Sequence, residues 1–200
     1  MDDQRRVYPP PPWQLAGECW WGLFRADRPV PLPDGLRPVL GARQLLLGLV
    51  RYRAGTLCYD ELIVGALALR GLTPGIWVHD IWVDSPVSMA GGRAIWGLPK
   101  QLASFHWPGA GVTVADGDGI LAALDLARPA MPLPPLPAGV VAFGRRKDGL
   151  LPFPISGWFC PGLGAMRLTH WSPRFGYHLD QRPLARLAAY PFRATFHPSW

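Results

Sequence analysis

Short apolar segments separated by proline and glycine run along most of the sequence. The chain has 24 prolines and 23 glycines among its 200 residues, and breakers this frequent leave little room for long helices. Apolar runs of about four to ten residues between breakers are typical of strands. The runs that predict strands are residues 19–24, 44–52, 58–69, 76–83, 101–107, 111–114, 120–126, 140–143 and 166–170. The pattern therefore predicts a fold that is predominantly β with few short helices.

The segments between these runs carry predictions of their own. Residues 89–97 are mostly small and predict a short helix. Residues 116–119 read Asp-Gly-Asp-Gly, and both residue types tolerate the positive φ that a hairpin turn requires. Residues 129–137 alternate proline with other apolar residues. This composition favours an extended connector between two parts of one sheet system.

Length and composition predict one domain. Two hundred residues, 49% of them hydrophobic, can bury a single well-formed core. Prolines fill positions 9–12, so we expect residues 1–12 to form a proline-rich N-terminal arm. The expected organisation is a single domain over residues 1–200 that includes this arm.

The formal charge of +6 raises the question of nucleic acid. The arginines are dispersed along the chain, however, and the densest basic cluster, residues 145–147, runs directly into Asp148 and Gly149. This arrangement favours a solvated turn over a basic binding stripe. We therefore expect no nucleic-acid partner.

Candidate metal ligands are sparse. Cys19, Cys58 and Cys160 lack paired CxxC spacing, so we expect free thiols rather than disulfides or zinc ligands. His79 and His106 lack the clustered partners that a metal site needs. The expectation is a protein with no bound metal.

The N-terminal segment does not have the composition of a signal peptide. No stretch reaches the roughly 18 to 20 apolar residues needed to cross a bilayer. We therefore expect a cytoplasmic protein with no membrane partner.

Lysine is rare in this chain, because only Lys100 and Lys147 stand among twenty basic residues. Lys100 ends the run GGRAIWGLPK, residues 91–100. Burial among apolar groups can lower the pKa of a lysine from about 10.4 by ~3 to 5. A lysine that has lost its proton is a nucleophile, whereas arginine stays charged. Lys100 is therefore a candidate covalent catalyst, and the alternative is a lysine whose stem lies along apolar surface with its head in water.

The run that ends at Lys100 and the segment CYDE, residues 58–61, together resemble the acetoacetate decarboxylase family. The family signature has a Gly-Arg pair, five intervening residues and Pro-Lys, with a Cys-Tyr-x-Glu-like segment upstream. Glu61 lies 39 positions before Lys100, which places both on the family's functional glutamate and Schiff-base lysine. The resemblance is clearest over residues 58–102 and extends more weakly to residues 20–27. It implies an antiparallel cone- or barrel-like α+β fold with the lysine in a closed interior, and assembly into homo-oligomers.

The resemblance implies that Lys100 forms an imine with a ketone and that Glu61 moves protons during the reaction. Acetoacetate decarboxylase is itself a known example of a lysine activated by desolvation or by a neighbouring cation. The imine is an electron sink that needs no cofactor, so a small 3-oxo acid would lose carbon dioxide. An ionised Glu61 would favour a charged amine, so we expect it to be partly protonated or held beside the substrate rather than against the free amine.

Other residues around the motif are candidates for substrate binding. Arg93 could hold a substrate carboxylate bidentately, or it could tie its loop to backbone carbonyls. The expected apolar walls of the site are Trp82, Trp96 and Leu98, although each could equally belong to the core. Asp60 and Asp80 are expected to be charges at strand edges.

The sequence departs from the family pattern at three positions, and these departures leave the reaction open. Gln101 stands where the decarboxylases have a second lysine, Gly17 where they have a substrate-facing arginine, and Leu46 where they have another glutamate. Decarboxylation of a 3-oxo acid remains the first hypothesis. An aldolase or dehydratase acting on a 2-oxo acid such as pyruvate is the second, and a non-catalytic protein that binds a hydrophobic small molecule is the third.

Overall fold

The computed structural model describes residues 7–199, so residues 1–6 of the expected arm lie outside the described residues. The structure is 61% strand and 7% helix, which confirms the predominantly β fold with few helices. The strands are β1 (Trp13–Arg25), β2 (Arg37–Pro38), β3 (Gln44–Gly55), β4 (Tyr59–Arg70), β5 (Thr73–Val83), β6 (Lys100–Leu102), β7 (Ser104–His106), β8 (Gly111–Asp116), β9 (Gly119–Ala127), β10 (Leu136–Arg146), β11 (Gly149–Gly162), β12 (Ala165–Trp171) and β13 (Ala185–Phe196). The helices are α1 (Pro86–Trp96) and the short 3-10 helix η1 (Pro173–Phe175).

Seven strands close into a barrel, as the family resemblance implied. Their order is β4, β3, β1, β13, β11, β10 and β5, and β5 pairs again with β4. All ladders between these strands are antiparallel except the one between β5 and β10, which is parallel. β2 pairs with the end of β4, and β6 pairs in parallel with β5.

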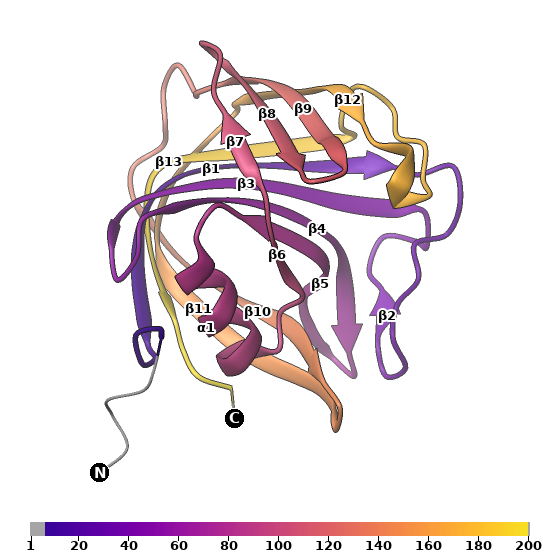
Figure 1. Ribbon diagram of the computed structural model, residues 1–200. Coiled ribbons are helices and arrows are strands. Elements are labelled where there is room, and N and C mark those ends of the chain that lie inside the picture. The colour runs from indigo at the N-terminus through magenta and orange to yellow at the C-terminus, as the bar shows by residue number, and fades with distance from the viewer. Residues whose placement is uncertain (1–6, 200) are drawn as a thin grey trace.

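A smaller sheet of β12, β9, β8 and β7 covers one side of the barrel (Figure 1). The space between this sheet and the barrel is one apolar core, which includes Leu47, Leu62, Val114 and Leu124. The barrel interior is a second core, and α1 lies on the far side of β3 and β4 from the small sheet (Figure 1). The described residues contain no helix that could span a bilayer.

Burial on both faces explains why β4 is apolar along nearly its whole length. Successive side chains of a strand point to opposite faces. Leu62 and Val64 pack in the core under the small sheet, whereas Tyr59 and Ile63 pack in the barrel interior. Glu61 shares the parity of Tyr59 and Ile63, so the strand itself directs its carboxylate into the barrel.

The helix α1 begins three residues before the predicted segment 89–97. Ser85 caps it by accepting a hydrogen bond from the Ser88 amide at 3.2 Å, and Pro86 occupies the first turn. Gly97 ends it in the left-handed conformation at φ 62°. The side chain of Arg146 donates to the Ile95 carbonyl at 3.0 Å and to the Ala94 carbonyl, so it satisfies acceptors in the last turn.

The predicted strand 101–107 is two strands. β6 belongs to the barrel sheet and β7 to the small sheet, and the chain crosses between them at Ala103. The connector expected at residues 129–137 likewise leads from the small sheet to the barrel, and its last two residues already belong to β10. A run of uniform hydrophobicity cannot reveal such a change of sheet, because both sheets face the same core.

The sequence analysis missed β11 because prolines interrupt it. Pro152 and Pro154 pair with β10, while the ladder between β11 and β13 begins only at Ile155. In an antiparallel strand the N–H and C=O of one residue point the same way. The carbonyl of Pro154 accepts from the His197 amide beyond the end of β13. The N–H groups that Pro152 and Pro154 lack would therefore point toward the β13 side, where no ladder has begun, so the prolines remove no hydrogen bond between strands.

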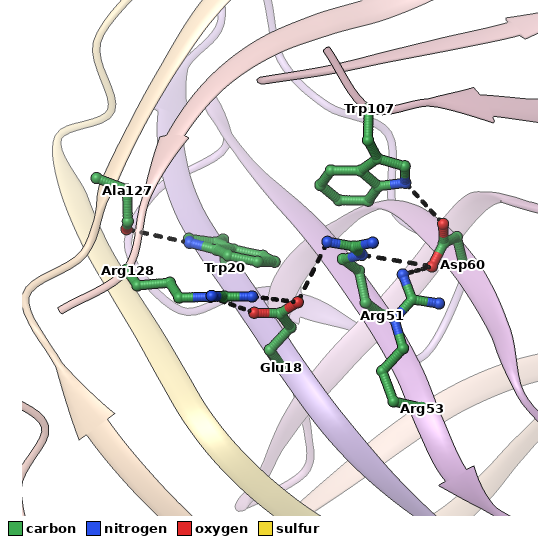
Figure 2. A network of polar contacts seen from close by, with 8 residues as sticks. All are labelled: Glu18, Trp20, Arg51, Arg53, Asp60, Trp107, Ala127 and Arg128. Atoms are coloured by element: carbon green, nitrogen blue, oxygen red, sulfur yellow. Dashed lines mark hydrogen bonds and ion pairs between the residues drawn. The ribbon is translucent and has the colours of Figure 1, made fainter. Parts of the chain in front are cut away.

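Three charged residues lie side by side on the outer face of the barrel, at the same height along the strands as Glu61 on the inner face. Glu18 on β1 is in register with Arg51 on β3, and Arg51 is in register with Asp60 on β4. Their chain neighbours Cys19 and Glu61 face inward. A polar network of Glu18, Arg51, Arg53, Asp60, Trp107 and Arg128, called here the outer network, joins these strands (Figure 2).

The two buried carboxylates of the outer network have different partners, which are arginines for Glu18 and, for Asp60, Trp107 together with an ion pair to Arg53 at 2.8 Å. Glu18 accepts from Arg128 Nε at 2.7 Å and from Arg51 Nη1 at 3.3 Å. Asp60 accepts from Trp107 Nε1 at 2.7 Å, and the Arg51 guanidinium lies 3.9 Å from the centre of the Trp107 ring. Burial raises the pKa of Asp60, and the hydrogen bond from Trp107 opposes that rise.

The substitution Glu18→Gln tests the outer network. Loss of the carboxylate weakens hydrogen bonds to two guanidinium groups, so we expect the free energy of unfolding to fall by about 2 to 3 kcal/mol. Urea denaturation followed by circular dichroism measures it. The matched control is Asp125→Asn, which removes the exposed pair between Asp125 and Arg167 and should cost less than about 1 kcal/mol. Equal losses for the two variants would contradict a role for the network in stability.

Candidate active site

Lys100 is placed by β6 and α1 together. It pairs in parallel with Ile81 of β5, which turns its side chain toward the barrel. A Cβ on Gly92 would lie 2.6 Å from both Cδ and Cε of Lys100, so only glycine lets α1 lie on the lysine stem. The Arg93 Nε donates to the Lys100 carbonyl at 2.7 Å and fixes the backbone there.

The Lys100 ammonium has three hydrogen-bond acceptors. Its Nζ donates to Glu61 Oε2 at 2.7 Å, to Ser88 Oγ at 2.9 Å and to Tyr59 OH at 3.4 Å. Lys100 is 2% exposed and Glu61 is 3% exposed. All three N–H donors of the ammonium are therefore used within the protein. The amine and the carboxylate form a direct, enclosed ion pair.

Two tyrosines complete the polar end of the site. Tyr52 OH donates to Glu61 Oε1 at 3.2 Å. Burial raises the pKa of Tyr52 and of Tyr59 well above the ordinary value, and the negative charge of Glu61 adds to both shifts. Both phenols therefore keep their protons throughout the working range and can serve as hydrogen-bond donors to Glu61 or to a bound molecule.

An apolar cavity of about 300 Å³ occupies the barrel interior, and Glu61 lies on its wall. All seven barrel strands contribute to it. Its lining is Cys19, Trp21, Leu46, Val50, Tyr52, Glu61, Ile63, Leu67, Ile76, Val78, Ile81, Leu98, Val140, Ala142, Phe153, Ile155, Phe159, Leu187, Phe192, Ala194 and Phe196. Burial raises the pKa of the Cys19 thiol to about 12, so it stays protonated.

Glu61 carries the charge in the cavity lining. Within residues 7–199, the lining contains no arginine, lysine or histidine. The same part of the chain has no group of three or more His, Cys, Asp or Glu side chains that could hold a metal ion. A molecule in the cavity would therefore meet apolar walls and one polar end, with the Lys100 ammonium bonded to the carboxylate at that end.

The structure brings Lys100 and Glu61 together, although not in the way the sequence predicted. Of the two expectations for Glu61, the position beside the substrate rather than against the free amine is wrong, because its Oε2 is 2.7 Å from Nζ; the other expectation stays a prediction. Leu98 lines the cavity. Trp96 packs behind the lining against Phe153, with ring centres 5.7 Å apart, and is not itself part of the wall.

Trp82 and Arg93 do not line the cavity, so each takes the alternative that the sequence had left open, Trp82 in a core and Arg93 at a backbone carbonyl. Trp82 points from β5 into the other core, where it packs edge-on against Phe175 at 5.3 Å. The parity of β5 decides this, since Ile81 faces the barrel. Arg93 is exposed, so of its two predicted roles it has the structural one, at the carbonyl of Lys100.

Arg93 also lines a basic cleft of about 560 Å³ on the surface, together with Trp77, His79, Gly97, Leu98, Pro99, Arg145, Arg146 and Lys147. Leu98 lines both this cleft and the interior cavity. The apolar side chain of Leu98 therefore lies at the boundary between the surface cations and the barrel interior.

The three departures from the family pattern have different structural meanings. Leu46 lines the cavity, so its replacement of a glutamate makes the wall apolar. Gly17 has no room for a side chain in this chain, since a Cβ there would lie 1.9 Å from the Arg51 carbonyl oxygen. Gln101 is exposed, because it follows Lys100 on β6 and takes the opposite parity.

Sequence reasoning did not nominate Tyr59, Tyr52 or Ser88 as site residues. Tyr59 could have been found, because it lies two positions before Glu61 on a strand and therefore on the same face. Tyr52 pairs with Tyr59 across the ladder between β3 and β4, which requires the register. Ser88 carries no sequence signal, since its contact with Lys100 depends on how α1 packs on β6.

Comparison with known proteins agrees with the geometry. The sequence profile described as Acetoacetate decarboxylase (ADC) matches residues 6–126. No curated protein matches the chain in sequence.

Similar solved structures share the fold at low sequence identity. An acetoacetate decarboxylase from Legionella pneumophila has a TM-score of 0.70 and 16% identity, covering 100% of this chain and 91% of its own. The enduracididine biosynthesis enzyme MppR complexed with pyruvate has a TM-score of 0.65 and 17% identity, with coverages of 98% and 92%. An acetoacetate decarboxylase-like enzyme from Sphingomonas wittichii RW1 has a TM-score of 0.60 and 14% identity, with coverages of 96% and 93%. With the family profile matching more than half of its length, the chain belongs to the acetoacetate decarboxylase family.

Proposed function

We propose that this protein is a Schiff-base lyase that decarboxylates a 3-oxo acid through an imine on Lys100. The observation that carries the proposal is the enclosed contact between Lys100 Nζ and Glu61 Oε2 at 2.7 Å, with Glu61 on the wall of an apolar cavity. An amine that can pass its proton to a neighbouring carboxylate is a nucleophile that needs no cofactor. Family membership supports the same chemistry.

Imine formation uses the ion pair as a proton reservoir. The Lys100 ammonium passes one proton to Glu61, and the neutral amine adds to the ketone carbon. The nitrogen loses a further proton to the former carbonyl oxygen, which gives a carbinolamine. Glu61 then returns its proton to that hydroxyl, water leaves, and a protonated imine remains. The net reaction is ammonium plus ketone to iminium plus water.

Carbon dioxide leaves next. The bond between the carboxylate and the adjacent carbon breaks, its electron pair moves into the iminium, and a neutral enamine forms. One proton on the enamine carbon restores the iminium, and water then releases the ketone and the lysine. Ser88 and Tyr59 are placed to hold Nζ while Glu61 carries the proton.

The absence of cations from the cavity lining of residues 7–199 favours decarboxylation over a reaction that retains the carboxylate. A carboxylate without a cation is poorly stabilised in apolar surroundings. Loss of carbon dioxide removes the carboxylate charge by neutralising it against the iminium, whereas an aldol reaction of a 2-oxo acid keeps the carboxylate from substrate to product. The apolar site therefore favours the charge-losing step.

The second candidate function is aldol condensation or dehydration of a 2-oxo acid such as pyruvate. It is supported by the similarity to MppR, which has been determined in complex with the condensation product of pyruvate and imidazole 4-carboxaldehyde. The same imine can lose a proton and become an enamine nucleophile. Supplying pyruvate with an aldehyde and looking for a condensation product, in parallel with carbon dioxide release from 3-oxo acids, distinguishes the two reactions.

Borohydride trapping tests the imine. Incubation with a panel of 3-oxo and 2-oxo acids followed by reduction should leave a stable adduct on Lys100, detected by mass spectrometry of the intact protein and of its peptides. The control is Lys100→Arg, which keeps the positive charge but has no amine that can form this imine. If no member of the panel gives an adduct, the protein is a binder rather than a lyase.

The substitution Glu61→Gln tests the proton transfer. We expect kcat for carbon dioxide release to fall by about 10²- to 10⁴-fold, because the amide cannot accept the lysine proton. The control is Tyr52→Phe, which removes only the hydrogen bond to Oε1 and should lower kcat by about tenfold or less. Thermal denaturation verifies that both variants are folded. Equal kcat values in the wild type and Glu61→Gln would exclude Glu61 as the base.

A further inference from the structure

The cavity is long in the direction of the strands. Its wall follows β4 from Glu61 to Leu67 and β3 from Leu46 to Tyr52. Six residue steps at about 3.3 Å each span roughly 20 Å. The register sets Tyr52 opposite Tyr59, so Glu61 and Tyr52 lie at one end of the cavity and Leu46 and Leu67 at the other.

Exposure increases along this length. At the Glu61 end, Tyr52 is 2% exposed and Val50, the register partner of Glu61, is 3% exposed. Toward the other end Trp21 is half-buried, and its register partner Leu187 is 48% exposed. The cavity wall is therefore closed near Glu61, and its more exposed residues Trp21 and Leu187 lie toward the other end.

Polarity is confined to the closed end. The polar members of the lining are Cys19, Tyr52 and Glu61, and Cys19 and Glu61 lie at the same level because both flank Val50 in the ladders. The remaining wall is aliphatic or aromatic. A four-carbon oxo acid would occupy the polar end and leave the apolar length of the cavity without a partner.

We propose that the substrate is a 3-oxo acid whose ketone bears an unbranched hydrophobic chain, with the ketone at Lys100 and the chain along the cavity toward Leu46 and Leu67. This inference rests on the proposed function and deepens it. Decarboxylation would convert such an acid into a methyl ketone and carbon dioxide. Each methylene that packs against the apolar wall is removed from water. This apolar contact would bind the substrate in place of the polar groups that the cavity lacks.

A chain-length series tests the inference. The rate of carbon dioxide release is measured for 3-oxobutanoate, 3-oxohexanoate, 3-oxooctanoate and 3-oxodecanoate. We expect kcat/KM to rise by about threefold to fourfold per methylene until the cavity is filled. Values that stay level or fall as the chain lengthens would overturn the inference and leave the proposed function intact.

A larger side chain at the Leu46 and Leu67 end of the cavity should shorten the hydrophobic chain of the preferred substrate. The variants are Leu46→Trp and Leu67→Trp, which enlarge the wall from two different strands, so that one suffices if the other does not fold. We expect the ratio of kcat/KM for 3-oxodecanoate to that for 3-oxobutanoate to fall at least tenfold. Leu46→Met, of similar volume, reports the effect of substitution without filling. An unchanged ratio in a folded tryptophan variant would contradict the placement of the chain.

A binding measurement distinguishes failure of this inference from failure of the proposed function. Methyl ketones from 2-pentanone to 2-undecanone are titrated into the wild-type protein and followed by tryptophan fluorescence, since Trp21 lines the cavity. Affinity that rises with chain length supports the hydrophobic chain even if no acid is turned over, and in that case only the lyase reaction is refuted. Affinity that does not depend on chain length overturns the inference.

Discussion

A lysine ammonium and a glutamate carboxylate lie 2.7 Å apart inside this barrel, almost without exposure to water. Removing two such charges from water costs several kcal/mol for each ion, and their attraction offsets that cost only when further hydrogen bonds satisfy the remaining donors and acceptors. Ser88, Tyr59 and Tyr52 supply those bonds. The site is therefore ordered before any substrate arrives, and a proton can move within it without rearrangement of the protein.

The position of Glu61 depends on the register of three strands. A slip of one residue would turn Glu61 out of the barrel and Asp60 into it. The outer network opposes such a slip, because Glu18, Arg51 and Asp60 are paired across β1, β3 and β4 at the level of Glu61. Charges on the outer face thus hold the inner face in place, and stability and function are linked through neighbouring residues of the same strands.

Local patterns in the sequence predicted the motif, the β-rich fold and most of the strands, because apolar runs and breakers are properties of short segments. They left open whether Arg93 would bind a substrate or bond backbone carbonyls, and they could not predict that Ser88 would contact Nζ, since both contacts depend on how α1 docks. The sequence also left open whether Trp82 lines the cavity or belongs to the core, because that depends on which residues of β5 face the barrel. The single domain, the oligomeric state and the cytoplasmic location stay predictions, as does the role of each site residue.

The charge inside the barrel constrains the order of the proposed steps. The resting pair is neutral overall, and a bound 3-oxo acid anion would leave the enclosed site with a net negative charge in apolar surroundings. In the proposed sequence the carboxylate of Glu61 takes the Lys100 proton and returns it to the leaving hydroxyl, so it is a carboxylate again when carbon dioxide leaves. The overall reaction consumes one proton when carbon dioxide is replaced by hydrogen. In this scheme that proton enters from water after decarboxylation, and the Glu61 carboxylate beside Nζ is the group proposed to pass it to the enamine carbon.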